Sequence, residues 1–81
     1  VEKKLAACVN VLPNIGSIYM WEGEIAEATE TKLLIKTKLD KMNDVFLTIK
    51  ELHSYEVPEI QVVEVSTGNL AYFNWMDEVL N

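Results

Sequence analysis

Three patterns in this 81-residue sequence predict one domain of mixed α+β fold. Two long segments rich in β-branched and aromatic residues flank Glu22-Gly23, which is typical of a β-hairpin. Two later segments repeat apolar residues at three- and four-residue steps, as amphipathic helices do. A β-branched run at residues 60–65, between those helices, predicts one further strand.

The predicted hairpin is unusually long for so small a chain. Its first arm starts at Cys8, is interrupted at Pro13, and resumes over residues 17–21; because Pro cannot donate to a ladder, a bulge or edge position is expected there. The return arm runs from Glu24 to Thr37, which is roughly 45 Å of extended chain. A compact domain of this length has a diameter of about 30 Å, so the ribbon must bend or leave its own domain.

The helices are predicted from their caps and their apolar spacing. Residues 1–5 resemble the last turns of a helix. Asp40 can cap a helix that ends near residues 53–55, and residues 56–59 form a linker because Pro58 favours extended geometry before it. Asn69 can cap a last helix, whose apolar face comprises Tyr72, Phe73, Met76, Val79 and Leu80.

This order of elements favours a ferredoxin-like plan. A helix end before the hairpin implies an earlier strand, and the helix after the hairpin connects to the strand at residues 60–65 by a crossover. The predicted fold is therefore βαββαβ plus a C-terminal helix, in one domain over residues 1–81. We expect the N-terminal strand and most of the first helix to be missing from this chain.

Apolar residues occupy both faces of the hairpin near its tip. In a strand, Tyr19 and Trp21 turn to one face while Ile18 and Met20 turn to the other. An isolated two-stranded ribbon of this kind is marginal in water and prone to associate. We expect a second copy of the chain to cover it, and the alternative is that the ribbon curls over its own helices.

Composition excludes some functions. The chain has 13 acidic residues, 7 lysines and no arginine, giving a net charge of −6, which argues against nucleic-acid binding. No apolar run is long enough to span a membrane. Cys8 is the one cysteine, so it cannot form an internal disulfide, and it is expected to be a small buried apolar residue. No nucleophile–base pair or phosphate-binding loop indicates an enzyme.

Four ordered motifs resemble the CutA family of divalent-cation tolerance proteins. They are EKKLAACVNVLP (residues 2–13), SIYMWEGEI (17–25), HSYEVPEI (53–60) and YFNW (72–75). The resemblance implies a ferredoxin-like subunit whose long hairpin builds a homotrimer, similar to that of PII signalling proteins. It implies a trimer interface through Ile18, Tyr19, Met20, Trp21 and Trp75.

The resemblance also implies a metal site. His53 and Glu59 match the family's histidine motif, in which Ser54 replaces a proline, and imidazole and carboxylate groups are ligands for copper and other divalent cations. One histidine cannot close a site alone. The alternative for His53 is a cation that caps the last helical carbonyls. The glutamates at positions 22, 24, 27 and 30 are expected to form a solvated face.

The function expected from this resemblance is non-enzymatic. It is a homotrimer linked to divalent-metal tolerance, chiefly of copper, with no required cofactor and with copper or another divalent cation as its ligand. Two alternatives remain: a PII-like regulator that binds a small ligand between subunits, and a trimeric scaffold or trafficking partner of another protein. If the source is bacterial, the expected compartment is the cytoplasm.

Overall fold

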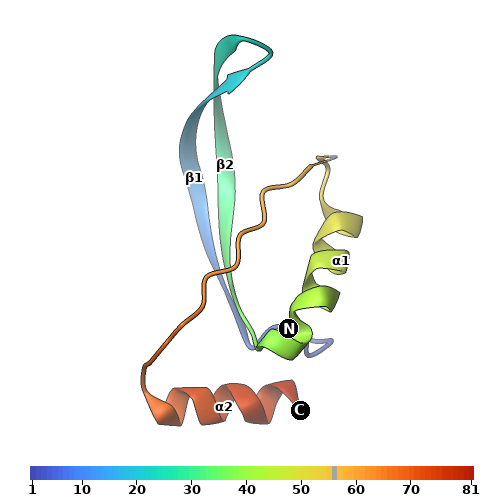
Figure 1. Cartoon of the computed structure of the whole chain (residues 1–81), viewed down its shortest axis with the longest axis vertical. Coiled ribbons are helices and arrows are strands. Elements are labelled where there is room, and N and C mark those ends of the chain that lie inside the picture. Colours follow the sequence, from blue (N-terminus) through green and yellow to red (C-terminus); the bar gives the residue numbers. More distant parts are fainter. Residues whose placement is uncertain (56) are drawn as a thin grey trace.

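The computed structural model describes residues 1–55 and 57–81 and has the predicted α+β composition. Strands β1 (Cys8–Trp21) and β2 (Glu24–Lys36) form one antiparallel pair, as Figure 1 shows. A short 3₁₀ turn, η1 (Leu39–Lys41), leads into helix α1 (Met42–Leu52). Helix α2 (Leu70–Leu80) lies across the foot of the hairpin.

The turn and the bulge of the hairpin follow from local sequence. Glu22 and Gly23 both have positive φ, 51° and 82°, as a two-residue hairpin turn of type I′ requires. At Pro13 and Asn14 the ladder shifts, because two residues of β1 lie opposite one residue of β2. Asn14 takes φ 60°, which Asn tolerates better than most residues. The interruption predicted at Pro13 is therefore confirmed as a bulge.

The register sorts the side chains of the hairpin onto two faces of different character. We call one the apolar face, because it carries Met20 opposite Ile25 and Val11 opposite Leu33, with Glu27 as its charged member. The bulge makes this possible, since its extra residue brings Val11 to the same face as Met20. The opposite face, here the charged face, carries Tyr19, Trp21, Glu24, Glu30, Lys32 and Lys36.

The two helices begin differently. The side-chain oxygen of Asn69 accepts a hydrogen bond from the backbone N–H of Ala71 at 2.9 Å, so the predicted cap of α2 is confirmed. Gly68 precedes Asn69. A Cβ added at Gly68 would lie 2.7 Å from the ring of Phe73, so the position has no room for a side chain. The predicted cap at Asp40 is wrong: Asp40 lies inside η1, and α1 begins after Lys41 without a side-chain cap.

Few apolar side chains in the described part of the chain are buried. They are Ala6 and Ala7, just before β1, and Leu80, at the end of α2. The Ala7 N–H donates to the Lys36 carbonyl at 2.8 Å, and the Thr37 hydroxyl donates to the Leu5 carbonyl at 2.6 Å. These two hydrogen bonds hold residues 5–7 beside the end of β2.

Two predicted elements are absent from the described residues. Residues 60–65 form no strand there, because a strand needs a neighbour to bond its N–H and C=O groups and none pairs with this segment. Residues 1–5 form a turn that reaches φ 59° at Lys4, since so short a segment cannot meet the cost of helix nucleation. Of the predicted linker, Glu56 lies outside the described residues.

The hairpin gives the molecule an elongated shape. Its principal extents are 46 × 26 × 20 Å and its radius of gyration is 15.2 Å, whereas about 12 Å is expected for a compact domain of this length. In Figure 1 the upper part of β1 and β2 stands clear of both helices. The hairpin therefore projects from the domain and does not curl over the helices of its own chain.

Candidate functional site

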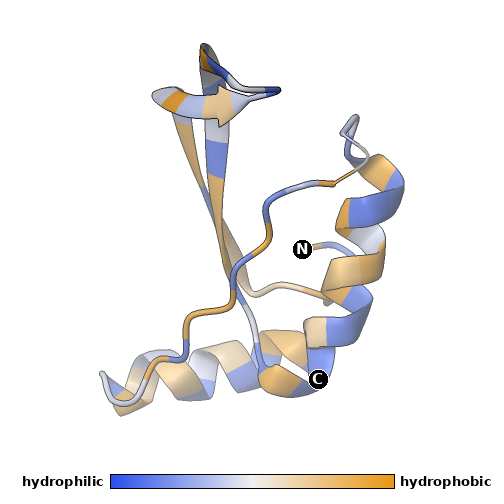
Figure 2. Cartoon of the chain, turned by 45° about the horizontal axis from the view of Figure 1, so that its top comes forward, coloured by the Kyte–Doolittle hydropathy of each residue, from blue (hydrophilic) through white to orange (hydrophobic). Residues whose placement is uncertain are grey.

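The tip of the hairpin exposes large apolar side chains on both faces. Ile18 and Met20 on the apolar face are 74% and 64% exposed, and Trp21 on the charged face is 65% exposed. Tyr19 beside it is 43% exposed. Figure 2 shows hydrophobic residues at the projecting end of the hairpin, far from the helices. The four hairpin residues that the sequence proposed as an interface are therefore accessible to a neighbour, two on each face.

The total surface shows how much of this chain is left uncovered. A compact monomer of 9.2 kDa exposes about 4,900 Å². This chain exposes 7101 Å², which is about 2,200 Å² more. Since a stable interface buries about 800 Å² on each partner, the excess is enough for more than one contact.

A second apolar stripe lies on α2. Phe73, Met76 and Leu80 turn inward, and Leu80 is fully buried. The predicted apolar face of α2 is therefore divided, because Tyr72 and Val79, with Trp75, stay partly exposed. The rings of Tyr72 and Trp75 lie 5.6 Å apart.

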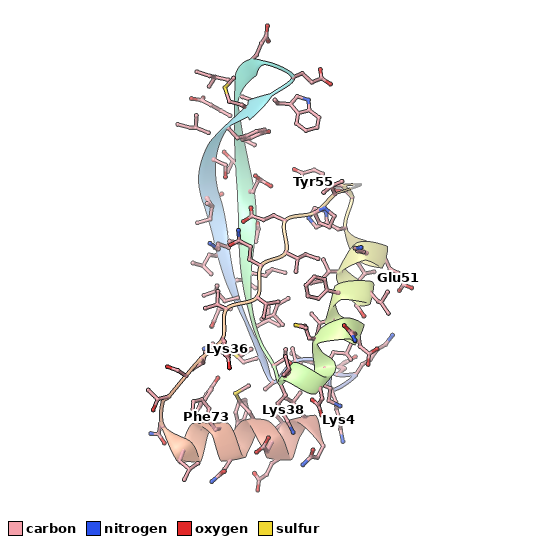
Figure 3. The ribbon with its side chains drawn as sticks, in the orientation of Figure 1. Lys4, Lys36, Lys38, Glu51, Tyr55 and Phe73 are labelled. Atoms are coloured by element: carbon pink, nitrogen blue, oxygen red, sulfur yellow. The ribbon has the colours of Figure 1, made fainter. Side chains whose placement is uncertain are left out.

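Lysines at the foot of the hairpin reach α2, a feature that the sequence analysis missed. Lys36 Nζ lies 5.7 Å from the centroid of the Tyr72 ring, within cation–π range. Lys38 pairs with Asp77 at 3.1 Å, and Lys4 Nζ donates to the Asn81 carbonyl at 2.7 Å. Figure 3 shows these three lysines along α2. The clustering of lysines in residues 1–4 and 32–41 was the available signal.

His53 ends α1, but its ring does not cap the helix. Its backbone N–H donates to the Ile49 carbonyl at 2.8 Å. Its Nδ1 accepts a hydrogen bond from the Tyr55 N–H at 3.0 Å, and the two rings lie 4.7 Å apart. The predicted cationic cap is therefore wrong, because Nδ1 is an acceptor. In the neutral ring the proton consequently resides on Nε2.

One chain does not form a closed metal site among its described residues. Residues 1–55 and 57–81 hold no group of three or more His, Cys, Asp or Glu side chains placed to bind one ion. His53 and Glu59 are both exposed, so each is accessible to an ion or to a second chain. Cys8 is partly exposed rather than buried as expected, and its thiol is free.

None of the helices in the described part of the chain is long and apolar enough to cross a bilayer. Among relatives, one rice protein is named "Protein CutA 1, chloroplastic" and is 40% identical over 76 residues. A solved structure from Archaeoglobus fulgidus is named as the periplasmic divalent cation tolerance protein CutA. The compartments named for relatives thus differ, and the cytoplasmic expectation stays a prediction.

Comparisons with known proteins identify the family. A family model described as "CutA1 divalent ion tolerance protein" matches residues 1–79. "Divalent-cation tolerance protein CutA" of Thermus thermophilus is 44% identical over 78 residues, which are 96% of this chain and 76% of that protein. "Protein CutA homolog" of Xenopus laevis is 42% identical over 80 residues, 99% of this chain and 53% of that protein, so this chain spans about half of that relative.

Solved structures agree with the sequence matches. CutA1 from Oryza sativa has a TM-score of 0.96 at 37% identity, and the match covers 100% of this chain and 74% of that one. The Archaeoglobus fulgidus structure has a TM-score of 0.93 at 41% identity, covering 99% of this chain and 78% of that one. The projecting hairpin, the helix across its foot and the sequence motifs thus occur together in relatives, and this chain belongs to the CutA1 family of divalent ion tolerance proteins.

Proposed function

We propose that this chain acts without enzymatic activity, as a homotrimer that binds divalent metal ions, chiefly copper, and contributes to tolerance of them. The observation that carries the trimer is the exposure of apolar residues on both faces of the projecting hairpin. Family membership supports the tolerance role. The trimer and the metal are separate claims, and each has its own experiment.

The uncovered surface supports a subunit with two neighbours. In a closed ring each subunit uses two different surfaces. Two contacts of the usual 800 Å² per partner use about 1,600 Å² of this excess of about 2,200 Å², which leaves roughly 600 Å² for a strand beside residues 60–65. Ile18 and Met20 on one face of the hairpin and Tyr19 and Trp21 on the other supply apolar area for two such contacts. Trp75 of α2, at the foot of the hairpin, adds a further exposed ring.

We propose His53 and Glu59 as metal ligands contributed to a site shared between subunits. A specific copper or zinc site needs about three or four ligands, and one chain does not bring that many together in its described part. The Nδ1 of His53 already accepts the Tyr55 N–H. An ion bound at Nδ1 takes the lone pair that accepts this hydrogen bond, and an ion bound at Nε2 moves the ring proton to Nδ1. Binding at either nitrogen therefore breaks the hydrogen bond from the Tyr55 N–H.

A Cu(II) titration followed by calorimetry tests the metal proposal. The variant His53→Asn keeps an acceptor for the Tyr55 N–H, because the Asn Oδ1 lies near the position of Nδ1, but removes the imidazole. We expect it to lose at least one bound copper per trimer, while Glu51→Gln, on the outer side of α1 in Figure 3, keeps the wild-type stoichiometry. An unchanged stoichiometry in the His53 variant removes His53 from the site and leaves the trimer proposal intact.

We also propose the complete ferredoxin-like topology, in which residues 60–65 become a strand. The support is their run of Ile60, Val62, Val63 and Val65, which favours a strand. The partner would be a strand that this sequence does not supply. Hydrogen exchange tests this proposal: amides of residues 60–65 are expected to be unprotected in this chain and protected in a longer protein that provides the strand.

A further inference from the structure

The turn that follows helix α1 places a ring nitrogen and a backbone nitrogen side by side. His53 Nδ1 lies 3.0 Å from the backbone nitrogen of Tyr55, whose N–H donates to it. Figure 3 shows Tyr55 beyond the end of α1. Metal–nitrogen bonds are about 2.0 Å long, so two nitrogens bound to one ion lie no more than about 4 Å apart. A single ion can therefore reach both nitrogens.

Backbone nitrogens matter at this position because side chains alone leave the site incomplete. Among residues 1–55 and 57–81, no three His, Cys, Asp or Glu side chains are placed to bind one ion. Cu(II) favours a square-planar set of nitrogen and oxygen donors. Once an imidazole anchors Cu(II), the ion can displace the proton of a nearby amide and bind its nitrogen, much as metal ions deprotonate the thiols and waters that they coordinate. The amides beside His53 are therefore candidate donors.

Hydrogen bonds decide which of these amides are available. The N–H of His53 donates to the Ile49 carbonyl at 2.8 Å, and the residues before it belong to α1. Binding of copper in that direction would break the helix. On the other side, His53 is already extended, with φ −77° and ψ 140°, and the exposed residues Ser54 and Tyr55 lie beyond α1. The Tyr55 N–H donates to Nδ1 itself, so the hydrogen bond that is lost is one that copper at Nδ1 breaks in any case.

We propose that Cu(II) binds to His53 Nδ1 and to the deprotonated backbone nitrogens of Ser54 and Tyr55. Each amide loses its N–H proton to the buffer as its nitrogen bonds to the ion, and copper stays as Cu(II), so no oxidant or reductant takes part. These three nitrogens leave one position in the plane for the Glu59 carboxylate of another copy. This inference rests on the proposed copper function and deepens it, because it names donors that the side chains do not supply.

The same donors make the site selective for copper. Cu(II) and Ni(II) accept a square-planar arrangement, whereas Zn(II) prefers a tetrahedral one and leaves amide protons in place at neutral pH. Ser54 has a role here through its backbone. A proline at this position, as in the histidine motif described above, has no N–H to lose.

Proline and alanine substitutions separate the backbone nitrogen from the side chain. Ser54→Pro and Tyr55→Pro each remove one N–H, whereas Ser54→Ala and Tyr55→Ala remove the same side chains and keep the N–H. Both positions are exposed and directly follow the end of α1, where proline is common, so we expect α1 to persist in all four variants. Far-UV circular dichroism verifies this. His53→Asn removes the anchoring imidazole.

Electron paramagnetic resonance and visible absorption of the protein loaded with Cu(II) identify the donors. For wild type we expect coupling to all three nitrogens, an absorption band at shorter wavelength than that of a copper site with imidazole and oxygen donors, and release of about two protons per copper. Each proline variant is expected to lose nitrogen coupling, to release fewer protons and to bind copper at least about tenfold more weakly, whereas each alanine variant stays within about threefold of wild type. Zn(II), the metal control, is expected to bind each proline variant and its alanine counterpart equally.

Two results overturn the proposal. If each proline variant keeps the spectra, the proton release and the copper affinity of its alanine counterpart, the backbone nitrogens are not ligands. If wild type binds Cu(II) with coupling to the imidazole alone and no amide proton is released, copper is held by side chains, and the proposed copper function still stands. A wild-type protein that binds no copper, or that binds it exactly as His53→Asn does, refutes both this site and the proposed role of His53.

Discussion

Replacing Trp21 with alanine is expected to weaken assembly far more than it weakens the single chain. Trp21 is 65% exposed, so about 160 Å² of a side chain of roughly 250 Å² is left for a neighbour to cover. At about 25 cal/mol per Å² this area contributes at most about 4 kcal/mol per subunit. A loss of about 3 kcal/mol corresponds to roughly a hundredfold weaker association at each contact.

The same substitution should change the free energy of unfolding of the isolated chain very little. Trp21 is at the solvent-exposed tip, and substitutions at such positions usually change the free energy of unfolding by less than about 0.5 kcal/mol. Sedimentation equilibrium measures association, and urea unfolding at a concentration below half-assembly measures the chain alone. Leu52→Ala, which removes an 81% exposed apolar side chain at the end of α1, is the control. If Trp21→Ala associates as tightly as this control does, the hairpin tip is not an interface and the reasoning fails.

Leu80→Ala, Asn69→Ala and Gly23→Ala, the first two with a matched control, test the fold around this surface by urea unfolding. Leu80→Ala is expected to lower the free energy of unfolding by about 2–5 kcal/mol, because Leu80 is 1% exposed, whereas Val79→Ala, at a 37% exposed position, should cost less than half as much. Asn69→Ala is expected to cost about 1 kcal/mol through loss of the Ala71 cap, and Asn69→Asp, which keeps the acceptor, is expected to cost little. Gly23→Ala should cost about 1 kcal/mol or more because φ is 82°, and a stabilised Gly23→Ala chain would contradict the turn described here.

Local rules on turns, caps and periodicity were sufficient to predict much of this fold. Pro13 predicted the bulge, Glu22-Gly23 predicted the turn, and Asn69 predicted the start of α2, because each acts through its own backbone geometry or its own hydrogen bond. The failure at Asp40 has a local cause of the same kind: a 3₁₀ turn before α1 includes Asp40 and moves the helix start to Met42.

Features that depend on distant partners could not be predicted in the same way. The apolar run at residues 60–65 is typical of a strand. Strand formation also needs a neighbouring strand, and none pairs with this segment in the described residues. The contact of Lys36 with Tyr72 joins residues far apart in sequence and was not anticipated.

The same distinction between local features and features that depend on distant partners applies to the candidate site. Alternation along β1 correctly placed Ile18 and Met20 on one face and Tyr19 and Trp21 on the other, since a strand has a period of two. The role of His53 was harder to predict, because its Nδ1 is engaged by the Tyr55 N–H, and that depends on how the chain turns after α1. In the proposed shared site, His53 and Glu59 take their further side-chain ligands from another copy, and residue spacing within one sequence carries no signal for such a contact.

The mass of this protein in solution tests the central claim most directly. Multi-angle light scattering on wild-type protein at micromolar concentration is expected to give three times the chain mass of 9.2 kDa, and the emission of Trp21 in the variant Trp75→Phe is expected to shift to the blue relative to the unfolded chain. A stable, folded species of 9.2 kDa throughout the concentration range, with Trp21 in water, would contradict the account.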